Sequence, residues 1–186
     1  MDKNKIIRYV YYLIKRLGNA LIAFISELFK QTSYLKGDDF EKCIRKKIYT
    51  KSRYVLVMKT HDFHENSKDY VESSLYPDYL FRDKKSNKEF FVEAKYRDKV
   101  TDGKIKWCND SQLKRYKKIG KETHVIIAIG LYGRPANPKH IFLVPLDEIE
   151  YCDLYTKFLA NYEYTENRKN LIDDLMDRVY NISKTR

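Results

Sequence analysis

Residues 77–95, PDYLFRDKKSNKEFFVEAK, contain two strand-like segments joined by a short polar turn. The segments 78–82 and 89–96 are rich in aromatic and apolar residues, and the intervening KKSN is typical of a turn. If the two strands form a hairpin, Asp78 lies across from Glu93, although 93 − 78 = 15 positions separate them. The stretch therefore predicts two neighbouring strands that bring a pair of carboxylates together.

The second strand carries charge in an otherwise apolar run. Glu93 and Lys95 are two positions apart, so both side chains project from the same face of a strand. Burying a carboxylate and an ammonium group is costly unless they pair or bind something. Asp78, Glu93 and the backbone carbonyl of Ala94 together form an all-oxygen set that suits Mg²⁺ or Mn²⁺.

Such a site suits hydrolysis of phosphodiester bonds. A divalent metal activates water, orients the phosphate and neutralises charge on its oxygens. A lysine beside the metal can stabilise the pentavalent transition state or help to deprotonate the water. A bare Glu-x-Lys is also common by chance, and a surface salt bridge on an edge strand is the other interpretation of these residues. The residues alone leave both interpretations open.

The order of motifs resembles the PD-(D/E)xK superfamily, the restriction-endonuclease-like nucleases. Pro77-Asp78 followed by Glu93-Ala94-Lys95 matches the signature, and the expected order of elements matches the αβββαβ core of that family. The resemblance covers roughly residues 37–146. It implies an α/β fold with a mixed central sheet flanked by helices, and a Mg²⁺- or Mn²⁺-dependent nuclease with no small-molecule cofactor.

Two flanking motifs extend the resemblance. Residues 37–41, GDDFE, resemble the Mrr-like GxxFE motif, which implies that Glu41 is a further acidic residue near the metal. Gln112 and Tyr116 resemble the RecB-like QxxxY motif, which implies positions near the active site and the nucleic-acid backbone. Glu41 could equally be a solvated charge, and Gln112 and Tyr116 could simply contact each other at i and i+4 on a helix. The implied catalytic set is Glu41, Asp78, Glu93, Lys95, Gln112 and Tyr116, with Asp78, Glu93, Ala94 and Glu41 at the metal.

The chain is basic, with a net charge of +11 and a pI near 9.4. Such a surface attracts nucleic acid, anionic lipid or acidic proteins. Basic runs follow Glu41 and surround Gln112, where lysine and arginine would neutralise phosphates and a tryptophan could stack on bases. The expected contacts with nucleic acid, DNA in preference to RNA, are Lys46, Lys47, Lys106, Trp107, Lys114, Arg115 and Lys118.

The N-terminal segment has a helical pattern of its own. Its apolar residues alternate steps of three and four, which places them on one helix face: Ile7, Val10, Ile14, Leu17, Leu21, Phe24 and Leu28. Packing on the domain, self-association as a homodimer and contact with a membrane surface are all open roles. Arg8, Lys15 and Arg16 leave no run of the ~18 uncharged residues that a spanning helix needs.

Composition and cysteine spacing indicate the class of protein and its compartment. The hydrophobic fraction of 43% excludes a wholly disordered chain, and the charged fraction of 34% excludes a polytopic membrane protein. Three cysteines without a CxxC pair are typical of a reduced, cytoplasmic protein. The predicted parts are an extra amphipathic helix over 1–33, a nuclease core over 34–150 and a helical C-terminal extension over 151–186.

Within these parts, Lys36-Gly37-Asp38-Asp39 is expected to break the first helix and start a second. The remaining expectations are strands at 55–58, 124–129 and 140–144, loops at 61–74 and 130–138 and through Gly103, and helices at 111–118 and about 166–182.

The function predicted from these features is hydrolysis of DNA phosphodiester bonds by a metal-dependent endonuclease. Two other functions stay open: a non-catalytic nucleic-acid-binding module with the same fold, and a membrane-surface or scaffold protein that acts through its N-terminal helix.

Overall fold

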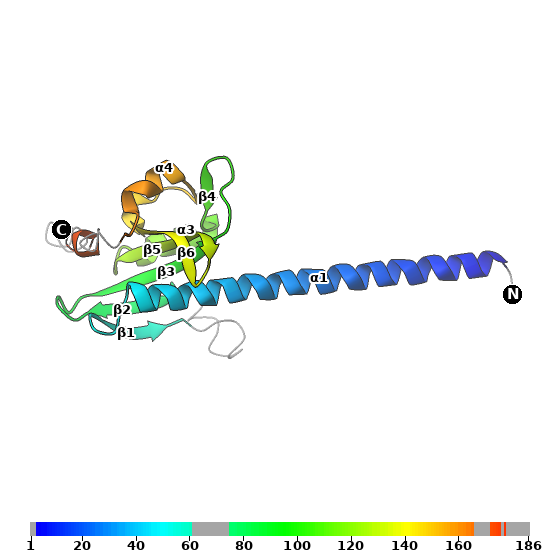
Figure 1. Ribbon diagram of the computed structural model, residues 1–186, viewed down its shortest axis with the longest axis horizontal. Coiled ribbons are helices and arrows are strands. Elements are labelled where there is room, and N and C mark those ends of the chain that lie inside the picture. The colour runs from blue at the N-terminus through cyan, green and yellow to red at the C-terminus, as the bar shows by residue number, and fades with distance from the viewer. Residues whose placement is uncertain (1–2, 61–74, 166–171, 176, 178–186) are drawn as a thin grey trace. The chain divides into compact units, whose positions relative to one another are not determined.

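A mixed five-stranded sheet is the main element of residues 39–186 (Figure 1). The computed structural model describes residues 3–60, 75–165, 172–175 and 177. The strands lie in the order β1-β2-β3-β5-β6, and their bounds are Tyr54–Lys59, Tyr79–Asp83, Glu89–Arg97, Val125–Arg134 and Asn137–Pro145. Only the β3–β5 pair is parallel among these neighbours. The predicted αβββαβ order with a mixed sheet is therefore confirmed.

Each face of the sheet has its own core. On one face, Phe40 and Ile44 of α1 (Lys3–Lys47) pack in a cluster with Val92 of β3. On the other face, Tyr116 of α3 (Asp110–Ile119) packs in a cluster with Phe91, the neighbour of Val92. Adjacent strand residues point to opposite faces, so a strand covered on both sides must be apolar almost throughout. This requirement makes the buried charge at Glu93 in β3 conspicuous.

The predicted helix break at 36–39 is wrong, because α1 is one continuous helix from Lys3 to Lys47. A glycine inside a helix costs only about 1 kcal/mol relative to alanine, and an added Cβ at Gly37 would meet nothing within 4 Å. Phe40, Cys43 and Ile44 are all buried, and this packing keeps the end of α1 helical. The chain nevertheless separates into two compact units, Met1–Asp38 and Asp39–Arg186.

The predicted loop over 130–138 is also wrong. β5 runs to Arg134 and β6 begins at Asn137, so the two strands form a hairpin with a short turn. Gly133 has φ 74°, the left-handed conformation that glycine adopts without strain. Gly130 lies inside β5, where an added Cβ would be 2.5 Å from the ring of Phe40. One glycine therefore allows a left-handed backbone near the end of β5, and the other makes room for the helix on the sheet.

Several short elements have no counterpart in the prediction. β4 (Lys104–Lys106), in the predicted loop, pairs with β7 (Asp153–Tyr155) in a separate two-stranded sheet. Three further short helices follow β6: η1 (Leu146–Glu148), α4 (Thr156–Leu159) and η2 (Ala160–Tyr162). The predicted loop at 61–74 lies outside the described residues, as does most of the helix predicted over 166–182. Of the latter, residues 172–175 and 177 are helical.

Candidate active site

The hairpin of β2 and β3 brings two acidic residues together. Tyr79 pairs with Val92 in the antiparallel register, which places the preceding Asp78 opposite Glu93. The backbone N–H of Asp78 donates a hydrogen bond to Glu93 Oε2 at 3.3 Å. The backbone N–H of Ala94 donates to Asp78 Oδ2 at 2.7 Å. Two residues 15 positions apart thus share one site, as the hairpin predicts.

Lys95 joins this pair from the same face of β3. Its ammonium group forms an ion pair with Glu93 Oε1, and the Glu93 side chain is only 2% exposed. Burial opposes the charged form of Lys95, but the carboxylates of Glu93 and Asp78 outweigh it and raise the pKa of Lys95 above its ordinary value. Lys95 is therefore a permanent positive charge beside two carboxyl groups at neutral pH.

Asp78 is held in an environment that disfavours its ionised form. Burial is the largest influence, and the nearby Glu93 carboxylate adds to it, so the pKa of Asp78 lies well above its ordinary value. Lys95 lowers this pKa in part, and Glu41 raises it further. A cation bound between Asp78 and Glu93 would stabilise the ionised form of both buried carboxyl groups.

Glu41 reaches the edge of this site from α1. Its Oε2 accepts a hydrogen bond from the Tyr79 hydroxyl at 2.7 Å and lies 3.7 Å from Lys59 Nζ. The charge of Glu41 contributes to the raised pKa of Asp78, so the two carboxyl groups interact electrostatically. Its hydrogen bond to Tyr79 and ion pair with Lys59 make Glu41 a peripheral member of the acidic group.

The donor chemistry at the centre suits a hard divalent cation. Among the described residues, no three His, Cys, Asp or Glu side chains are grouped closely enough to hold a metal ion. Mg²⁺, however, is commonly held by one or two carboxylates, with water and substrate phosphate as its other ligands. Asp78, Glu93 and the carbonyl of Ala94 therefore fit Mg²⁺ or Mn²⁺ as an open set of oxygen donors.

Helix α3 contributes a buried tyrosine to the site. The Tyr116 side chain is 2% exposed, and its hydroxyl forms a hydrogen bond with Glu93. Burial, followed by the charges of Glu93 and Asp78, raises the pKa of Tyr116, so the phenol stays protonated. A neutral phenol that donates to Glu93 orients this carboxylate toward its other partners.

Gln112 helps to cap the N-terminus of α3, a structural role that was not predicted from the sequence. Its Oε1 accepts a hydrogen bond from the Asn109 backbone N–H at 3.3 Å, and Asn109 Oδ1 accepts one from the Gln112 backbone N–H at 2.8 Å. This reciprocal pair is a capping box that starts α3. The Asn-x-x-Gln spacing would have revealed it. Gln112 still lines the groove beside Lys95, with its carbonyl oxygen engaged in the cap.

A cationic groove adjoins the acidic centre. It has a volume of about 510 Å³ and is lined by Lys95, Arg97, Lys106, Trp107, Cys108, Asn109 and Gln112. The Arg97 guanidinium donates to the carbonyl oxygens of Lys106 at 2.6 Å and Trp107 at 3.0 Å, which fixes it at the groove. The sequence interpretation missed Arg97, although its position two residues after Lys95 on one strand face was a usable signal.

The prediction that Trp107 stacks on bases is wrong for this structure. Trp107 is fully buried in the core beneath α3, and its indole N–H donates to the Tyr151 carbonyl oxygen at 3.0 Å. Its ring packs against Tyr116, with 6.4 Å between the ring centroids. A large aromatic ring gains more from burial in a core than from exposure on a charged surface. Trp107 therefore supports the helix that carries Tyr116.

The predicted cationic contacts differ in accessibility. Five are exposed and available to a polyanion: Lys46, Lys47, Lys106, Lys114 and Lys118. Among them, Lys47 donates to Asn137 Oδ1 at 2.6 Å. Arg115 is half-buried, and its guanidinium lies 5.3 Å from the centroid of the Tyr116 ring. The contact of these lysines with nucleic acid stays a prediction, whereas Arg115 packs on the tyrosine of the site.

These elements define a mixed α/β fold in which Asp78, Glu93 and Lys95 come together where β2 and β3 pair. No protein-family model matches the sequence, and no curated protein matches it. Among solved structures, the chain is similar to Hjc of Archaeoglobus fulgidus, a Holliday junction resolvase from an archaeal hyperthermophile. The identity is 10% and the TM-score 0.48, over 67% of this chain and 93% of Hjc.

Proposed function

We propose that this protein is a metal-dependent nuclease that hydrolyses DNA phosphodiester bonds as an endonuclease, with Mg²⁺ or Mn²⁺. The observation that carries the proposal is the convergence of Asp78, Glu93 and Lys95 on one face of the sheet. A purely structural ion pair would need only Glu93 and Lys95. The second carboxyl group, at Asp78, is energetically unfavourable without a cation.

The two carboxylates and the Ala94 carbonyl would hold the metal. When bound, the ion supplies Lewis-acid chemistry, which polarises the phosphate and lowers the pKa of water. The Tyr116 hydroxyl keeps Glu93 oriented, and the Ala94 N–H does the same for Asp78. Glu41 adds negative charge at the edge of the site and thereby strengthens its attraction for a cation.

Lys95 would stabilise the transition state. Because its pKa is raised, Lys95 has no free electron pair at neutral pH and does not act as a general base. Its fixed charge beside the two carboxyl groups would stabilise the extra negative charge of a pentavalent phosphate bound there. Arg97 and Lys106 line the same groove and suit the neighbouring phosphates of a nucleic-acid strand.

The proposal is tested by incubating the full chain with supercoiled plasmid and with single-stranded DNA in Mg²⁺, in Mn²⁺ or in EDTA. Cleavage with either metal and none in EDTA is the expected result, and the preferred DNA form would then identify the substrate. An inert protein that still binds DNA in both metals would instead be a binding module with a nuclease fold. Binding in either case should weaken steeply with salt, because each neutralised phosphate releases a counterion.

Replacing Tyr116 by phenylalanine should lower the cleavage rate about 10-fold and raise the Mg²⁺ concentration needed for half-maximal rate, because Glu93 loses an orienting donor. The ring and its contact with Trp107 are retained, so the fold should be unchanged. The matched control is Tyr151→Phe, which removes a hydroxyl from a side chain that is 70% exposed. Equal rates and equal Mg²⁺ dependence for both variants would show that the Tyr116 hydroxyl plays no part.

A further inference from the structure

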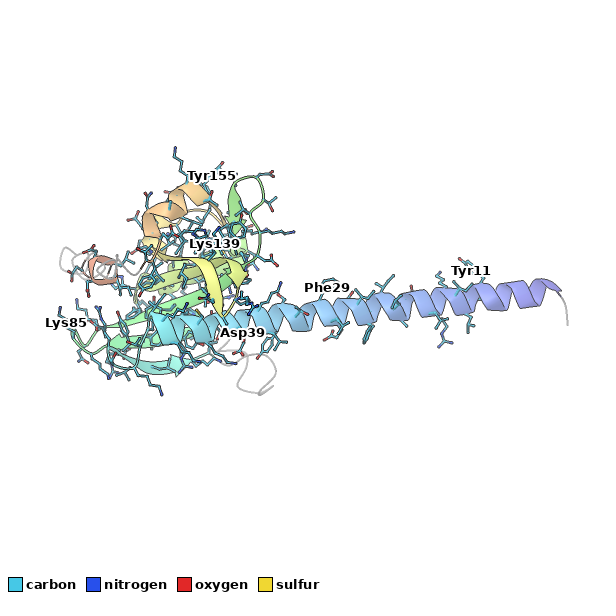
Figure 2. The ribbon with its side chains drawn as sticks, viewed as in Figure 1. Tyr11, Phe29, Asp39, Lys85, Lys139 and Tyr155 are labelled. Carbon is cyan, nitrogen blue, oxygen red and sulfur yellow. The ribbon has the colours of Figure 1, made fainter. Side chains whose placement is uncertain are left out.

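The N-terminal unit, Met1–Asp38, presents an apolar surface that the proposed nuclease does not use. Between Tyr11 and Leu35, thirteen large apolar side chains of α1 are exposed, from 42% at Ile25 to 72% at Phe29. Figure 2 shows side chains standing out along this helix, with Tyr11 and Phe29 labelled. Eleven of the thirteen, all except Tyr12 and Tyr34, lie on one half of the helix, and soluble proteins rarely leave so large an apolar surface in water. The surface therefore needs a partner.

The apolar face is broad. At 3.6 residues per turn, it extends from Leu13 and Phe24 at one edge to Ile22 and Phe29 at the other, about half of the helix circumference. The opposite half carries most of the polar residues, among them the exposed Lys15 and Arg16, together with Tyr12 and Tyr34. Residues 1–38 contain seven Lys or Arg and three Asp or Glu, so their net charge is 7 − 3 = +4. The unit is thus both amphipathic and cationic.

A second copy of this helix would cover the face poorly. A two-stranded coiled coil buries a narrow seam, here the residues spaced alternately by three and four. Ile22 and Phe29 lie well away from that seam, and they are among the most exposed side chains of the helix, at 65% and 72%. The positions that flank the seam include Leu13 and Ile25, where coiled coils usually carry opposite charges. A flat lipid surface would cover the apolar half of this helix more completely than a second helix would.

We propose that the part of α1 that lies in this unit, residues 3–38, lies on a membrane surface that contains anionic lipid. Its apolar half would enter the boundary between headgroups and acyl chains, where aromatic residues such as Phe24 and Phe29 are favoured. Lys15, which lies next to the Ile22 edge on the helix wheel, would reach lipid phosphates, and the net charge of +4 draws the unit to an anionic leaflet. Across the described part of the chain, no helix is long and apolar enough to cross a membrane.

This proposal is independent of the nuclease reaction and is tested on the full chain by co-sedimentation with lipid vesicles. Binding is expected to vesicles that mix phosphatidylglycerol with phosphatidylcholine. It should be several-fold weaker with phosphatidylcholine alone, or with mixed vesicles in high salt. Failure to bind the mixed vesicles would overturn the proposal, whether or not the protein cleaves DNA.

Two matched double variants isolate the apolar face. Ile22→Glu with Phe29→Glu adds two negative charges to the apolar half, and vesicle binding should fall about 10-fold or more. Asn19→Glu with Ser26→Glu adds the same charge to the polar half, and binding should fall only about two- to three-fold. Equal losses for the two variants would mean that charge alone drives binding, which contradicts an inserted apolar face.

Light scattering of the lipid-free protein tests whether the apolar face binds a second copy of the chain instead of a membrane. The proposal would be overturned if the protein forms a stable oligomer that does not bind vesicles, and if Ile22→Glu with Phe29→Glu converts this oligomer to monomers. The apolar face would then serve self-association. Both double variants should cleave DNA in solution like the wild type, since the altered residues lie outside the unit that carries Asp78 and Glu93.

Discussion

Replacing Glu93 by glutamine is expected to lower Mg²⁺-dependent DNA cleavage by about 1,000-fold or more, with the α/β core still folded. Glutamine has nearly the same shape as the glutamate that is 1% exposed here, so packing should be preserved. The substitution removes the negative charge that would hold the metal and that pairs with Lys95. Initial cleavage rates across Mg²⁺ concentrations, together with circular dichroism and a thermal melt, measure both parts of the expectation.

The matched control lies on the same strand. Glu89→Gln makes the same chemical change at the start of β3, where the 37% exposed Glu89 side chain pairs with Arg82. It should leave cleavage within about two-fold of the wild type, because exposed ion pairs contribute little. Retention of cleavage by the folded Glu93→Gln variant would remove Glu93 from the site. If that variant does not fold, the cleavage rate of Lys95→Met, which keeps both carboxylates, tests the same site. This rate should also fall.

Replacing Asp78 by asparagine should abolish cleavage and, in EDTA at neutral pH, make the protein more stable. Burial and the Glu93 carboxylate raise the pKa of Asp78, so the folded state binds a proton more tightly than the unfolded state does. The stability that this group contributes is fully present below its unfolded pKa and is lost as pH rises through the raised folded pKa. Asparagine can still accept the hydrogen bond from the Ala94 N–H without carrying a charge.

The expected gain is about 1 kcal/mol or more, because a pKa difference of one unit between the folded and unfolded states corresponds to about 1.4 kcal/mol. Urea unfolding in EDTA measures it, and the difference between variant and wild type should grow with pH and shrink in acid. Adding Mg²⁺ should stabilise the wild type but not the variant, because binding to the folded state shifts the equilibrium. A variant that is less stable than the wild type at every pH would show that Asp78 serves the fold rather than a cation.

The three strands around the site were predicted within one or two residues. The predicted segments 55–58, 78–82 and 89–96 correspond to β1, β2 and β3. Alternation along a strand and a polar turn between two strands are local signals, which do not depend on the rest of the fold. The opposition of Asp78 and Glu93 follows from the same hairpin, so it too was predictable.

The errors arose where packing between distant residues outweighs a local preference. Gly37 and Gly130 are typical of breaks and turns, yet Gly37 lies inside α1 and Gly130 lies inside β5 against Phe40. The basic stretch around Trp107 predicts stacking on a nucleic-acid base, but Trp107 fills the core beneath Tyr116. A preference worth about 1 kcal/mol is easily overridden by burial of a large side chain, which is worth more.

The sequence by itself determined which residues form the acidic pair and which lysine stands beside it, because residue type and spacing along two neighbouring strands are enough. Only the tertiary structure decided the raised pKa values of Asp78 and Lys95, the hydrogen bond from Tyr116 to Glu93, and the place of Arg97 in the groove. These properties depend on burial and on distances between residues remote in the chain, and electrostatic free energies change steeply with both.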